Sequence, residues 1–266
     1  MLPHPHRVPH AFNTSFILPL TKPITPNTLK CLRDVLKRAS PPPSPTADPT
    51  TKTHNAAVLI PFCNVADQPG ILLEVRGKSL RSHSGEVSFP GGRVDDTDPS
   101  FLSAALRETH EELGVISNRV NVLGEMGPPE KNLRGDMLVW PFVGFIHAAS
   151  GEQPKSDDEP FPSLDMEVLR REVSQLEVDT VFHLPLSALT SPLRMRSYLF
   201  RGRRPYWAIE VTDLVQKDGV AVDIIPPEDA LIELDDEVGA GRGGRVEIWG
   251  LTGWYLSMLM RTLNVY

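Results

Sequence analysis

Residues 107–115 read Arg-Glu-Thr-His-Glu-Glu-Leu-Gly-Val and carry the strongest signal in the sequence. On a helix, residues three and four positions apart share a face, so Glu108, Glu111 and Glu112 are expected to project together. Three like charges repel one another, and hard divalent cations with oxygen ligands relieve that repulsion. The segment therefore predicts a carboxylate site for Mg²⁺ or Mn²⁺; the alternative is an acidic face that meets only water. The opposite face is predicted to be buried through Leu102, Ala105, Leu106, Thr109 and Leu113.

The ends of this helix are marked by residues with strong positional preferences. Asp98 is a candidate N-cap, and Pro99 suits the first helical position because its ring fixes φ near the helical value. Gly114 ends the helix, since glycine adopts the left-handed conformation of a C-terminal cap without strain. The sequence thus predicts a helix from Pro99 to Leu113, preceded by the loop Phe89-Pro90-Gly91-Gly92.

Short apolar segments on both sides of the helix predict β-strands. The continuous apolar run at 56–60 is typical of a strand buried on both faces. The predicted strands cover residues 56–60, 71–76, 119–126, 138–146, 178–184 and 206–211, and a closing helix covers 252–263. Strands interleaved with long helices indicate an α/β (α+β) fold, with a mixed β-sheet sandwiched between α-helices.

Composition excludes several classes of protein. The 266 residues are 40% hydrophobic and 23% charged, which is ordinary for a chain that buries a core. The net charge of 27 − 34 = −7 argues against a general nucleic-acid binder, and the absence of an apolar stretch near 18 residues argues against a membrane span. Two cysteines cannot build a disulfide framework, which fits a reducing intracellular compartment.

The 26 prolines are concentrated at the N-terminus and divide the chain. Residues 1–55 are predicted to form a proline-rich extension with one short helix, capped by Asn27 or Thr28 and apolar on one stripe. Residues 56–266 are predicted to form the main domain, with surface insertions near 150–162 and 233–245. The first insertion is expected to be solvated rather than to act as a lid. The helix stripe consists of Leu29, Leu32, Val35 and Leu36.

The glutamate segment and the residues before it resemble the box of the Nudix hydrolases. That box reads glycine, an acidic residue, then Arg-Glu, an apolar residue, any residue, Glu-Glu, any residue, glycine and an apolar residue. Here Gly92 and Asp98 precede residues 107–115. Asp98 replaces the usual glutamate, Thr109 stands where an aliphatic residue is usual, and one extra residue separates Gly92 from Arg107. The resemblance covers residues 56–263 and implies the Nudix fold.

A second motif resembles the coenzyme A diphosphatase subgroup of that family, which includes fungal-type peroxisomal enzymes. The subgroup has two leucines, threonine, any residue, arginine and a small residue, then spaced arginine and glycine, then Phe-Pro-Gly-Gly. Every spacing is kept here, with Glu74 in place of threonine and Gly77 in place of serine or alanine. The resemblance implies substrate-binding roles for Arg76, Arg81, Gly85, Phe89, Gly91 and Gly92.

The resemblance also implies a mechanism. Glu108, Glu111 and Glu112 would hold Mg²⁺ or Mn²⁺, which polarise a phosphoryl oxygen and activate a water that attacks phosphorus in line. Arg107 would orient a neighbouring glutamate, and Glu108 is a candidate for activating the water. His110 is expected on another face, without a catalytic role. Coenzyme A or an acyl-CoA would give 3′,5′-ADP and (acyl-)4′-phosphopantetheine.

Two other readings of the same residues stay open. The box would also suit a hydrolase of ADP-ribose, dinucleotides or oxidised nucleoside triphosphates. A catalytically silent module that binds a nucleotide or coenzyme A is the alternative from another class, and the intact glutamates argue against it. The expected partner is a small-molecule substrate, with no nucleic acid and no membrane. The resemblance favours a peroxisomal location, although the last residues, 263–266, are not a Ser-Lys-Leu-type address, and mitochondrial or cytosolic locations stay open.

Overall fold

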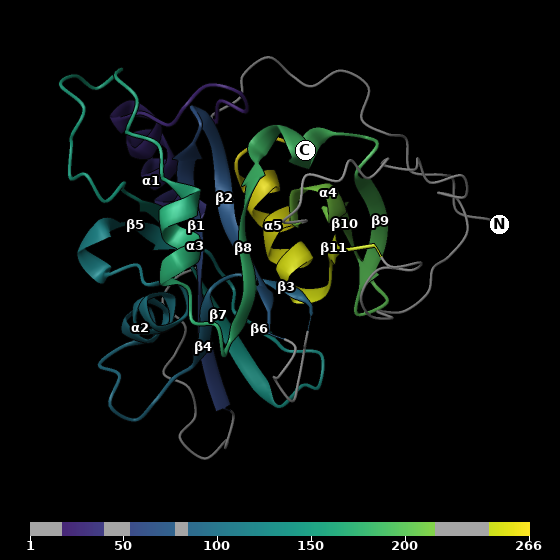
Figure 1. Ribbon diagram of the computed structural model, residues 1–266. Helices are drawn as coiled ribbons and strands as arrows, with labels where there is room; N and C mark the ends of the chain where they lie inside the picture. The colour runs from purple at the N-terminus through teal and green to yellow at the C-terminus, as the bar shows by residue number, and fades with distance from the viewer. Residues whose placement is uncertain (1–17, 40–53, 78–84, 216–244) are drawn as a thin grey trace.

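The computed structural model describes residues 18–39, 54–77, 85–215 and 245–266. Its centre is an eight-stranded mixed sheet in the order β3-β2-β1-β7-β5 (Figure 1). β4 pairs with β1, β6 with β7 and β8 with β2, and only the β1–β7 pair is parallel. The strands are β1 (His54–Val65), β2 (Gln68–Arg76), β3 (Val87–Ser88), β4 (Gly91–Arg93), β5 (Val120–Glu125), β6 (Glu130–Lys131), β7 (Met137–Ile146) and β8 (Val178–Pro185).

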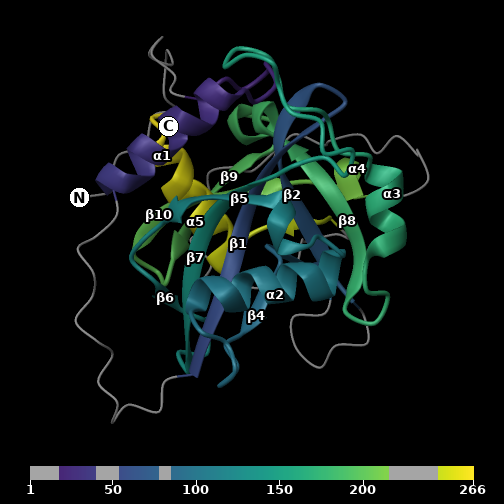
Figure 2. The same ribbon diagram turned by 90° about the vertical axis from the view of Figure 1, so that its left-hand side faces the viewer.

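Helices cover both faces of this sheet, as the sequence predicted. α2 (Phe101–Leu113) and α3 (Met166–Glu172) lie over one face, and α1 (Pro26–Ala39) and α5 (Gly250–Thr262) lie over the other (Figures 1 and 2). The predicted mixed sheet between helices is therefore confirmed. Of the helices in the described ranges, none combines the length and apolarity that a membrane crossing needs.

A second, three-stranded sheet packs beyond α5. It contains β9 (Met195–Phe200), β10 (Arg204–Glu210) and β11 (Glu247–Ile248), and the short helix α4 (Thr212–Val215) follows β10. The strand predicted at 206–211 therefore exists but belongs to this second sheet. β9 was not predicted, because its polar and apolar residues do not alternate clearly. Two single-turn 3₁₀ helices, Ser117–Arg119 and Leu186–Thr190, complete the described elements.

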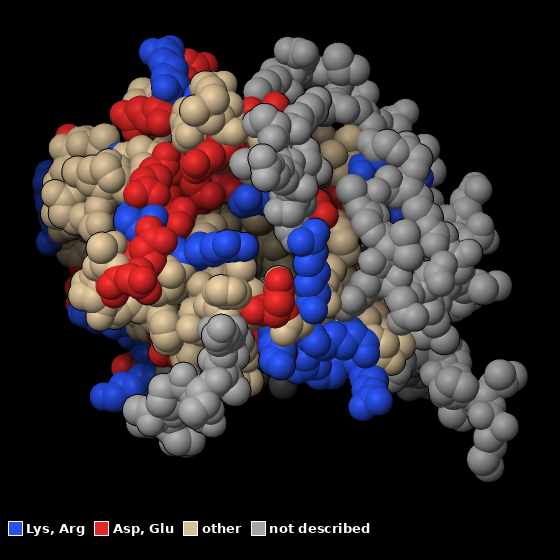
Figure 3. Space-filling view, turned by 90° about the horizontal axis from the view of Figure 1, so that it is seen from below, with Lys and Arg blue, Asp and Glu red and all other residues tan. Residues whose placement is uncertain are grey.

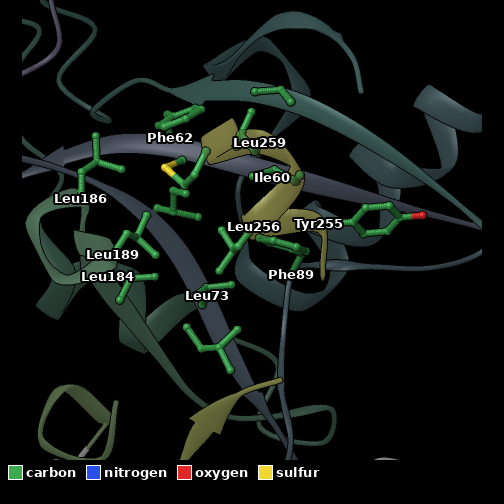
Figure 4. Close-up of a cluster of buried hydrophobic side chains, with 14 of the residues drawn as sticks. Ile60, Phe62, Leu73, Phe89, Leu184, Leu186, Leu189, Tyr255, Leu256 and Leu259 are labelled. Atoms are coloured by element: carbon green, nitrogen blue, oxygen red, sulfur yellow. The ribbon is translucent and has the colours of Figure 1, made fainter. Parts of the chain in front are cut away.

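β1 is buried on both faces because its side chains alternate between two cores. Ile60 and Phe62 join the core under α5, whereas Leu59 and Cys63 join the core under α2. Figure 4 shows the first of these cores, where side chains from β1, β2 and β8 meet Leu256 and Leu259 of α5. A strand with two buried faces needs a continuous apolar run, which is the pattern that predicted it.

α1 packs against the same core as α5. Its predicted stripe, Leu29, Leu32, Val35 and Leu36, is buried, which confirms the amphipathic helix. The predicted caps were wrong: the helix begins at Pro26, so Asn27 and Thr28 lie in its first turn. The cap is Thr25, whose Oγ1 accepts a hydrogen bond from the Thr28 amide at 3.2 Å.

The acidic segment 150–162 contains no helix or strand and lies against α1. Lys30 Nζ lies 2.5 Å from Asp157 Oδ2, and Asn27 Nδ2 donates to Asp158 Oδ1 at 2.7 Å. Phe161, at the end of the segment, is 6% exposed and belongs to the core. The acidic side chains are exposed, as expected, but the segment is anchored. The second predicted insertion, 233–245, lies outside the described residues except for Arg245.

Asn64 fastens this N-terminal part of the chain to β1. Its side chain is buried; Oδ1 accepts from the Ile24 amide at 2.7 Å, and Nδ2 donates to the carbonyls of Ile24 and Phe161 at 3.0 and 2.9 Å. The side chain therefore satisfies backbone groups from two segments that are distant in sequence. No local pattern in the sequence indicates this role.

Replacing Asn64 by alanine is expected to lower the free energy of unfolding by about 3 kcal/mol, because buried backbone groups without partners cost roughly 1–3 kcal/mol each. Chemical denaturation with urea would measure the change. Asn118→Ala is the matched control, since Asn118 is exposed. A loss in Asn64→Ala no larger than in the control would contradict the assignment.

Candidate active site

α2 begins two residues later than predicted and ends where predicted. Ser100, not Asp98, is the N-cap: its Oγ accepts from the Ser103 amide at 3.1 Å, and the helix starts at Phe101. Pro99 therefore lies before the helix. Gly114 adopts φ 69° and its amide donates to the His110 carbonyl at 2.9 Å, which confirms the predicted C-cap. Asp98 cannot cap the helix because its carboxylate is bound elsewhere.

Arg107 is the partner of Asp98. The guanidinium donates to both Asp98 oxygens at 3.0 and 3.1 Å, to Glu108 Oε1 at 3.0 Å and to Glu111 Oε2 at 2.9 Å. A further bond reaches the Arg93 carbonyl at 3.0 Å. The hydrogen bonds from Arg107 lower the pKa of Asp98, and they raise the pKa of Arg107 in return. Arg107 thus orients two glutamates of α2, and Asp98 holds Arg107.

The three glutamates of α2 differ in burial. The side chains of Glu108, Glu111 and Glu112 are 16%, 50% and 5% exposed. Glu112 turns inward, where its Oε2 accepts the Gly91 amide at 2.8 Å. His110 is exposed. The buried face differs in part from the predicted stripe, because Leu102 and Leu106 are only half-buried; the buried residues are Ala104, Ala105, Thr109, Glu112 and Leu113.

The glycine pair of β4 lies against the chain itself. Gly91 has φ 147°, and a Cβ there would lie 2.4 Å from the Ala57 carbonyl oxygen. A Cβ on Gly92 would lie 2.5 Å from the Glu108 carboxyl carbon. Position 91 therefore requires glycine so that β4 can pair with β1, whereas glycine at position 92 leaves room for the carboxylate of Glu108 in its observed place.

Arg76 lies at the end of β2 between two buried carboxylates. Its Nη1 is 3.8 Å from Glu74 Oε1 and 3.9 Å from Glu112 Oε1, and its side chain is 25% exposed. Phe89 is buried, and Gly85 has φ 76° with its amide donating to the Arg76 carbonyl at 3.0 Å. Arg81 lies outside the described residues.

Glu74 is a member of the site that the sequence reasoning missed. It was noted only as a replacement for threonine, but its side chain is fully buried beside Arg76. Ser88 Oγ donates to its Oε1 at 3.1 Å, while Oε2 has no hydrogen-bond partner among the described residues. Burial is the main reason that its pKa rises to about 8. A charged residue inside the apolar strand 71–75 was the signal that could have revealed it.

Some of these residues line one pocket of about 520 Å³. Ala56 and Val58 of β1 lie at its base. Gly91, Gly92, Glu108 and Glu112 line it on the side of β4 and α2, together with Arg76 and Glu177. Figure 3 shows acidic and basic side chains next to one another around a hollow on this face of the molecule. The other side is formed by the β6–β7 turn and the start of α5, through Asn132, Leu133, Arg134, Asp136, Met137, Val139, Trp249, Gly250, Leu251, Thr252 and Tyr255.

The carboxylates in this pocket are of the type that hard divalent cations bind. Glu108 and Glu112 line the pocket and Glu177 faces them, whereas Glu111 is held by Arg107 outside it. Within the described ranges, no three His, Cys, Asp or Glu side chains are already gathered as a metal-binding group. Binding an ion with all three glutamates of α2 therefore requires Glu111 to turn away from Arg107.

Crowding of buried acids perturbs their titration. Burial, with the nearby Glu74 charge second, raises the pKa of Glu112 to about 9. Burial also raises the pKa of Glu108. These carboxyl groups hold their protons more tightly in the folded chain than in the unfolded chain. A cation in the pocket would remove this effect, because it favours the ionised form.

The metal-free protein is therefore expected to lose stability as pH rises from about 5 to about 9. Above 4.5, the ordinary value, the unfolded chain releases the proton of Glu112 while the folded chain keeps it until its own pKa near 9. Thermal unfolding in EDTA would show the decline, at about 2–4 °C for each kcal/mol lost. The Glu112→Gln variant is the control, and an equally steep decline in that variant would contradict the assignment.

The segment that contains the pocket's acidic wall can now be classified. Residues 53–180 match the NUDIX domain model, and the described part of this segment has the Nudix fold. Curated relatives include the "Uncharacterized Nudix hydrolase NudL" of Enterobacter sp. (strain 638), 39% identical over 145 residues. That match covers 54% of this chain and 62% of the relative. The protein of the same name from Escherichia coli O7:K1 is 40% identical over 138 residues, which are 52% of this chain and 60% of the relative.

Solved structures of Nudix proteins are also similar to this chain. The NUDIX domain of Shewanella oneidensis NrtR complexed with ADP ribose is 19% identical and covers 54% of this chain and 81% of its own, with a TM-score of 0.35. A binary complex of Caenorhabditis elegans Ap4A hydrolase is 18% identical and covers 50% of this chain and 81% of its own, also with a TM-score of 0.35. Both likenesses are too distant to carry an argument about the substrate.

Proposed function

We propose that this protein is a divalent-metal-dependent hydrolase of nucleoside diphosphate-linked substrates, and that coenzyme A or an acyl-CoA is the substrate. The observation that carries the proposal is the pocket in which Glu108 and Glu112 of the Nudix helix lie beside the guanidinium of Arg76. A diphosphate is an anion and cannot approach bare carboxylates. It can approach them when cations lie between the diphosphate and the carboxylates. This pocket offers carboxylates that can bind a metal ion, and it also offers an arginine that can bind phosphate.

Glu108 and Glu112 would hold Mg²⁺ or Mn²⁺, with Glu111 joining them once it leaves Arg107. The bound ion would supply Lewis-acid activation of a phosphoryl oxygen and lower the pKa of a water molecule. Glu177 is a further carboxylate that lines the pocket and could contribute an oxygen ligand. This proposed set extends the one expected from the sequence by a residue that lies 65 positions beyond Glu112, immediately before β8.

The chain's own residues would do three things during hydrolysis. Arg76 would bind a non-bridging oxygen of the diphosphate, and its charge is available in part because its ion pairs are as long as 3.8 and 3.9 Å. Glu108, half-buried, would accept a proton from the attacking water. Arg107 would keep Glu108 in place through the 3.0 Å hydrogen bond.

The choice of coenzyme A rests on the upstream motif, four of whose residues lie at the pocket. Arg76, Phe89, Gly91 and Gly92 all line the pocket with the glutamates of α2. Water would add across the diphosphate bridge, so that one phosphate leaves on 3′,5′-ADP and the other on 4′-phosphopantetheine. The NudL relatives support a Nudix hydrolase, and their printed names do not state a substrate.

Product analysis by chromatography tests this function. The purified chain would be incubated with coenzyme A, ADP-ribose and a deoxynucleoside triphosphate, each with Mg²⁺, Mn²⁺ or EDTA, beside Glu112→Gln. Metal-dependent formation of 3′,5′-ADP and phosphopantetheine, lost in the variant, is the expected result. Preferential cleavage of ADP-ribose or the triphosphate would overturn the choice of substrate. Saturable binding of coenzyme A without any product would instead indicate a silent binding module.

A further inference from the structure

The turn between β6 and β7 forms a wall of the pocket and has a defined shape. Asn132 organises residues 132–136: its Nδ2 donates to Asp136 Oδ1 at 2.8 Å, and its Oδ1 accepts the Met137 amide at 3.2 Å. Gly135 has φ 77°, which glycine adopts without strain, and its amide donates to the Asn132 carbonyl at 2.9 Å. The turn therefore holds Leu133 and Arg134 at its tip.

Contacts from the second half of the chain fix this turn in place. Arg201 Nη2 donates to the carbonyls of Lys131 and Asn132 at 2.7 and 2.9 Å. Arg204 makes a two-pronged ion pair with Glu130 at 2.5 and 3.0 Å, and Tyr255 of α5 accepts the Glu130 amide at 2.9 Å. A turn tied at so many points presents its side chains to the pocket in a reproducible position.

Arg134 is the cation that this turn presents. Its side chain is exposed and lines the pocket. The charge nearest to it in the turn is Asp136, whose pKa is lowered mainly by the hydrogen bond from Asn132 and to a smaller extent by Arg134. Arg76 differs in its surroundings, because it lies within 4 Å of two carboxylates on the side of β4 and α2. β7 and β4 flank β1 on opposite edges, so Arg134 and the glutamates face the pocket from different sides.

The surroundings of Arg134 indicate which part of a substrate it meets. The neighbouring lining residues include the apolar Leu133, Met137, Trp249 and Leu251, beside the polar pair Asn132 and Asp136, which hydrogen-bond to each other. A wall with a large apolar part and Arg134 as its cation suits a nucleoside that carries a negative group of its own, whereas the diphosphate belongs beside Arg76 and the glutamates. A phosphomonoester is the strongest such group, because a guanidinium can bind two of its oxygens at once.

We propose that Arg134 determines specificity by binding a phosphomonoester on the ribose of the substrate, which in coenzyme A is the 3′-phosphate. The inference rests on the proposed function for the identity of the substrate. The same chemistry would suit a 2′-phosphate, as in a phosphorylated dinucleotide, and the two sources differ only in the position of the phosphate. Arg134 is thus a residue for recognition, away from the atoms that react.

The test measures binding by calorimetry, so that it does not depend on turnover. The full chain would be titrated with 3′,5′-ADP, 2′,5′-ADP and 5′-AMP in Mg²⁺, and compared with Arg134→Ala and Arg134→Lys. Arg203→Ala is the matched control, because it removes the same charge from a position outside the pocket. Arg203 is exposed near the β9–β10 turn and does not line the pocket. Hydrolysis of coenzyme A and of dephospho-coenzyme A, which lacks the 3′-phosphate, would be measured in parallel.

The unsubstituted chain is expected to bind 3′,5′-ADP at least about tenfold more tightly than 5′-AMP, the advantage of one charge-assisted contact. Arg134→Ala should weaken the binding of 3′,5′-ADP about tenfold and change the affinity for 5′-AMP by no more than about twofold. The affinity of Arg134→Lys for 3′,5′-ADP should lie between those of the unsubstituted chain and Arg134→Ala. Arg203→Ala should change neither affinity. The ratio of kcat/KM for coenzyme A over its dephospho form should fall in step.

Two results would overturn the inference, and a third separates it from the proposed function. Equal weakening of all ligands in Arg134→Ala, or no weakening, would remove Arg134 as the discriminating residue. A preference for 2′,5′-ADP would overturn its assignment to coenzyme A. The chain could also prefer 3′,5′-ADP through Arg134 and yet cleave no coenzyme A. That result would support the inference about Arg134 and overturn only the proposed hydrolysis.

Discussion

Replacing Glu112 by glutamine is expected to lower kcat for the metal-dependent hydrolysis by about 1000-fold, equivalent to roughly 4 kcal/mol of transition-state stabilisation. The physical reason is the loss of a buried negative charge at the position where a cation must bind. Glutamine keeps the size of the side chain, and its amide oxygen can still accept the Gly91 amide that now lies 2.8 Å from Glu112 Oε2. Steady-state kinetics at saturating Mg²⁺ would measure the loss, and circular dichroism would establish that the fold is retained.

Glu111→Gln is the informative comparison for this experiment. Glu111 is half-exposed and bound to Arg107, so its replacement should lower kcat by only about tenfold. The structure thus predicts different losses in kcat for two glutamates that the Nudix box does not distinguish. If Glu112→Gln retained more than a tenth of the activity, or if Glu111→Gln were the more damaging change, the assignment of Glu112 as the central metal ligand would be wrong.

Replacing Arg107 by alanine is expected to lower kcat by about 100-fold, although Arg107 does not need to touch the substrate. The change removes the one cation that bonds to Asp98, Glu108 and Glu111, and leaves three carboxylates to repel one another. Glu108 would lose its 3.0 Å hydrogen bond and no longer be held against Gly92. Misplacement of a catalytic group by about 1 Å is enough to cost a factor of this size.

A double-mutant cycle with Asp98 separates positioning from general destabilisation. The Asp98 carboxylate binds Arg107 and also accepts the Asp95 amide at 2.9 Å, but its link to the glutamates of α2 runs through Arg107. Asp98→Ala should therefore lower kcat by about tenfold on its own. Combined with Arg107→Ala, it should cause no further loss, because both changes remove the same interaction. Additive losses in kcat would show that the two residues act independently and would contradict the arrangement described above. Thermal unfolding of each variant would control for loss of the folded state.

Local signals in the sequence predicted much of this fold and part of the site. Gly114 predicted the end of α2 because a left-handed cap favours glycine wherever it occurs. The apolar run at 56–60 predicted β1 because a strand with two buried faces has no polar positions. The spacing of Glu108 and Glu112 along a helix placed both in one site. Each of these inferences depends on residues within a few positions of one another.

The remaining features depend on contacts between distant segments. Asp98 was predicted to cap the helix, but its carboxylate binds Arg107, nine residues later, and Ser100 is the cap. Glu74 has a hydrogen-bond partner because the pairing of β2 with β3 places Ser88 opposite it. Arg134 reached the pocket because Arg201 and Tyr255, from the other half of the chain, hold its turn. No periodicity within one segment could have shown these three contacts.

The packing of α1 has a practical consequence for anyone who prepares the protein. The match to the NUDIX model begins at residue 53, which suggests a natural place to start a shortened fragment. Such a fragment would lack the buried stripe of α1 and would also leave Asn64 and Phe161 without their partner at Ile24. The uncovered apolar patch would favour aggregation during expression. Crystallisation and assay samples should therefore retain the chain from before Leu18 onward.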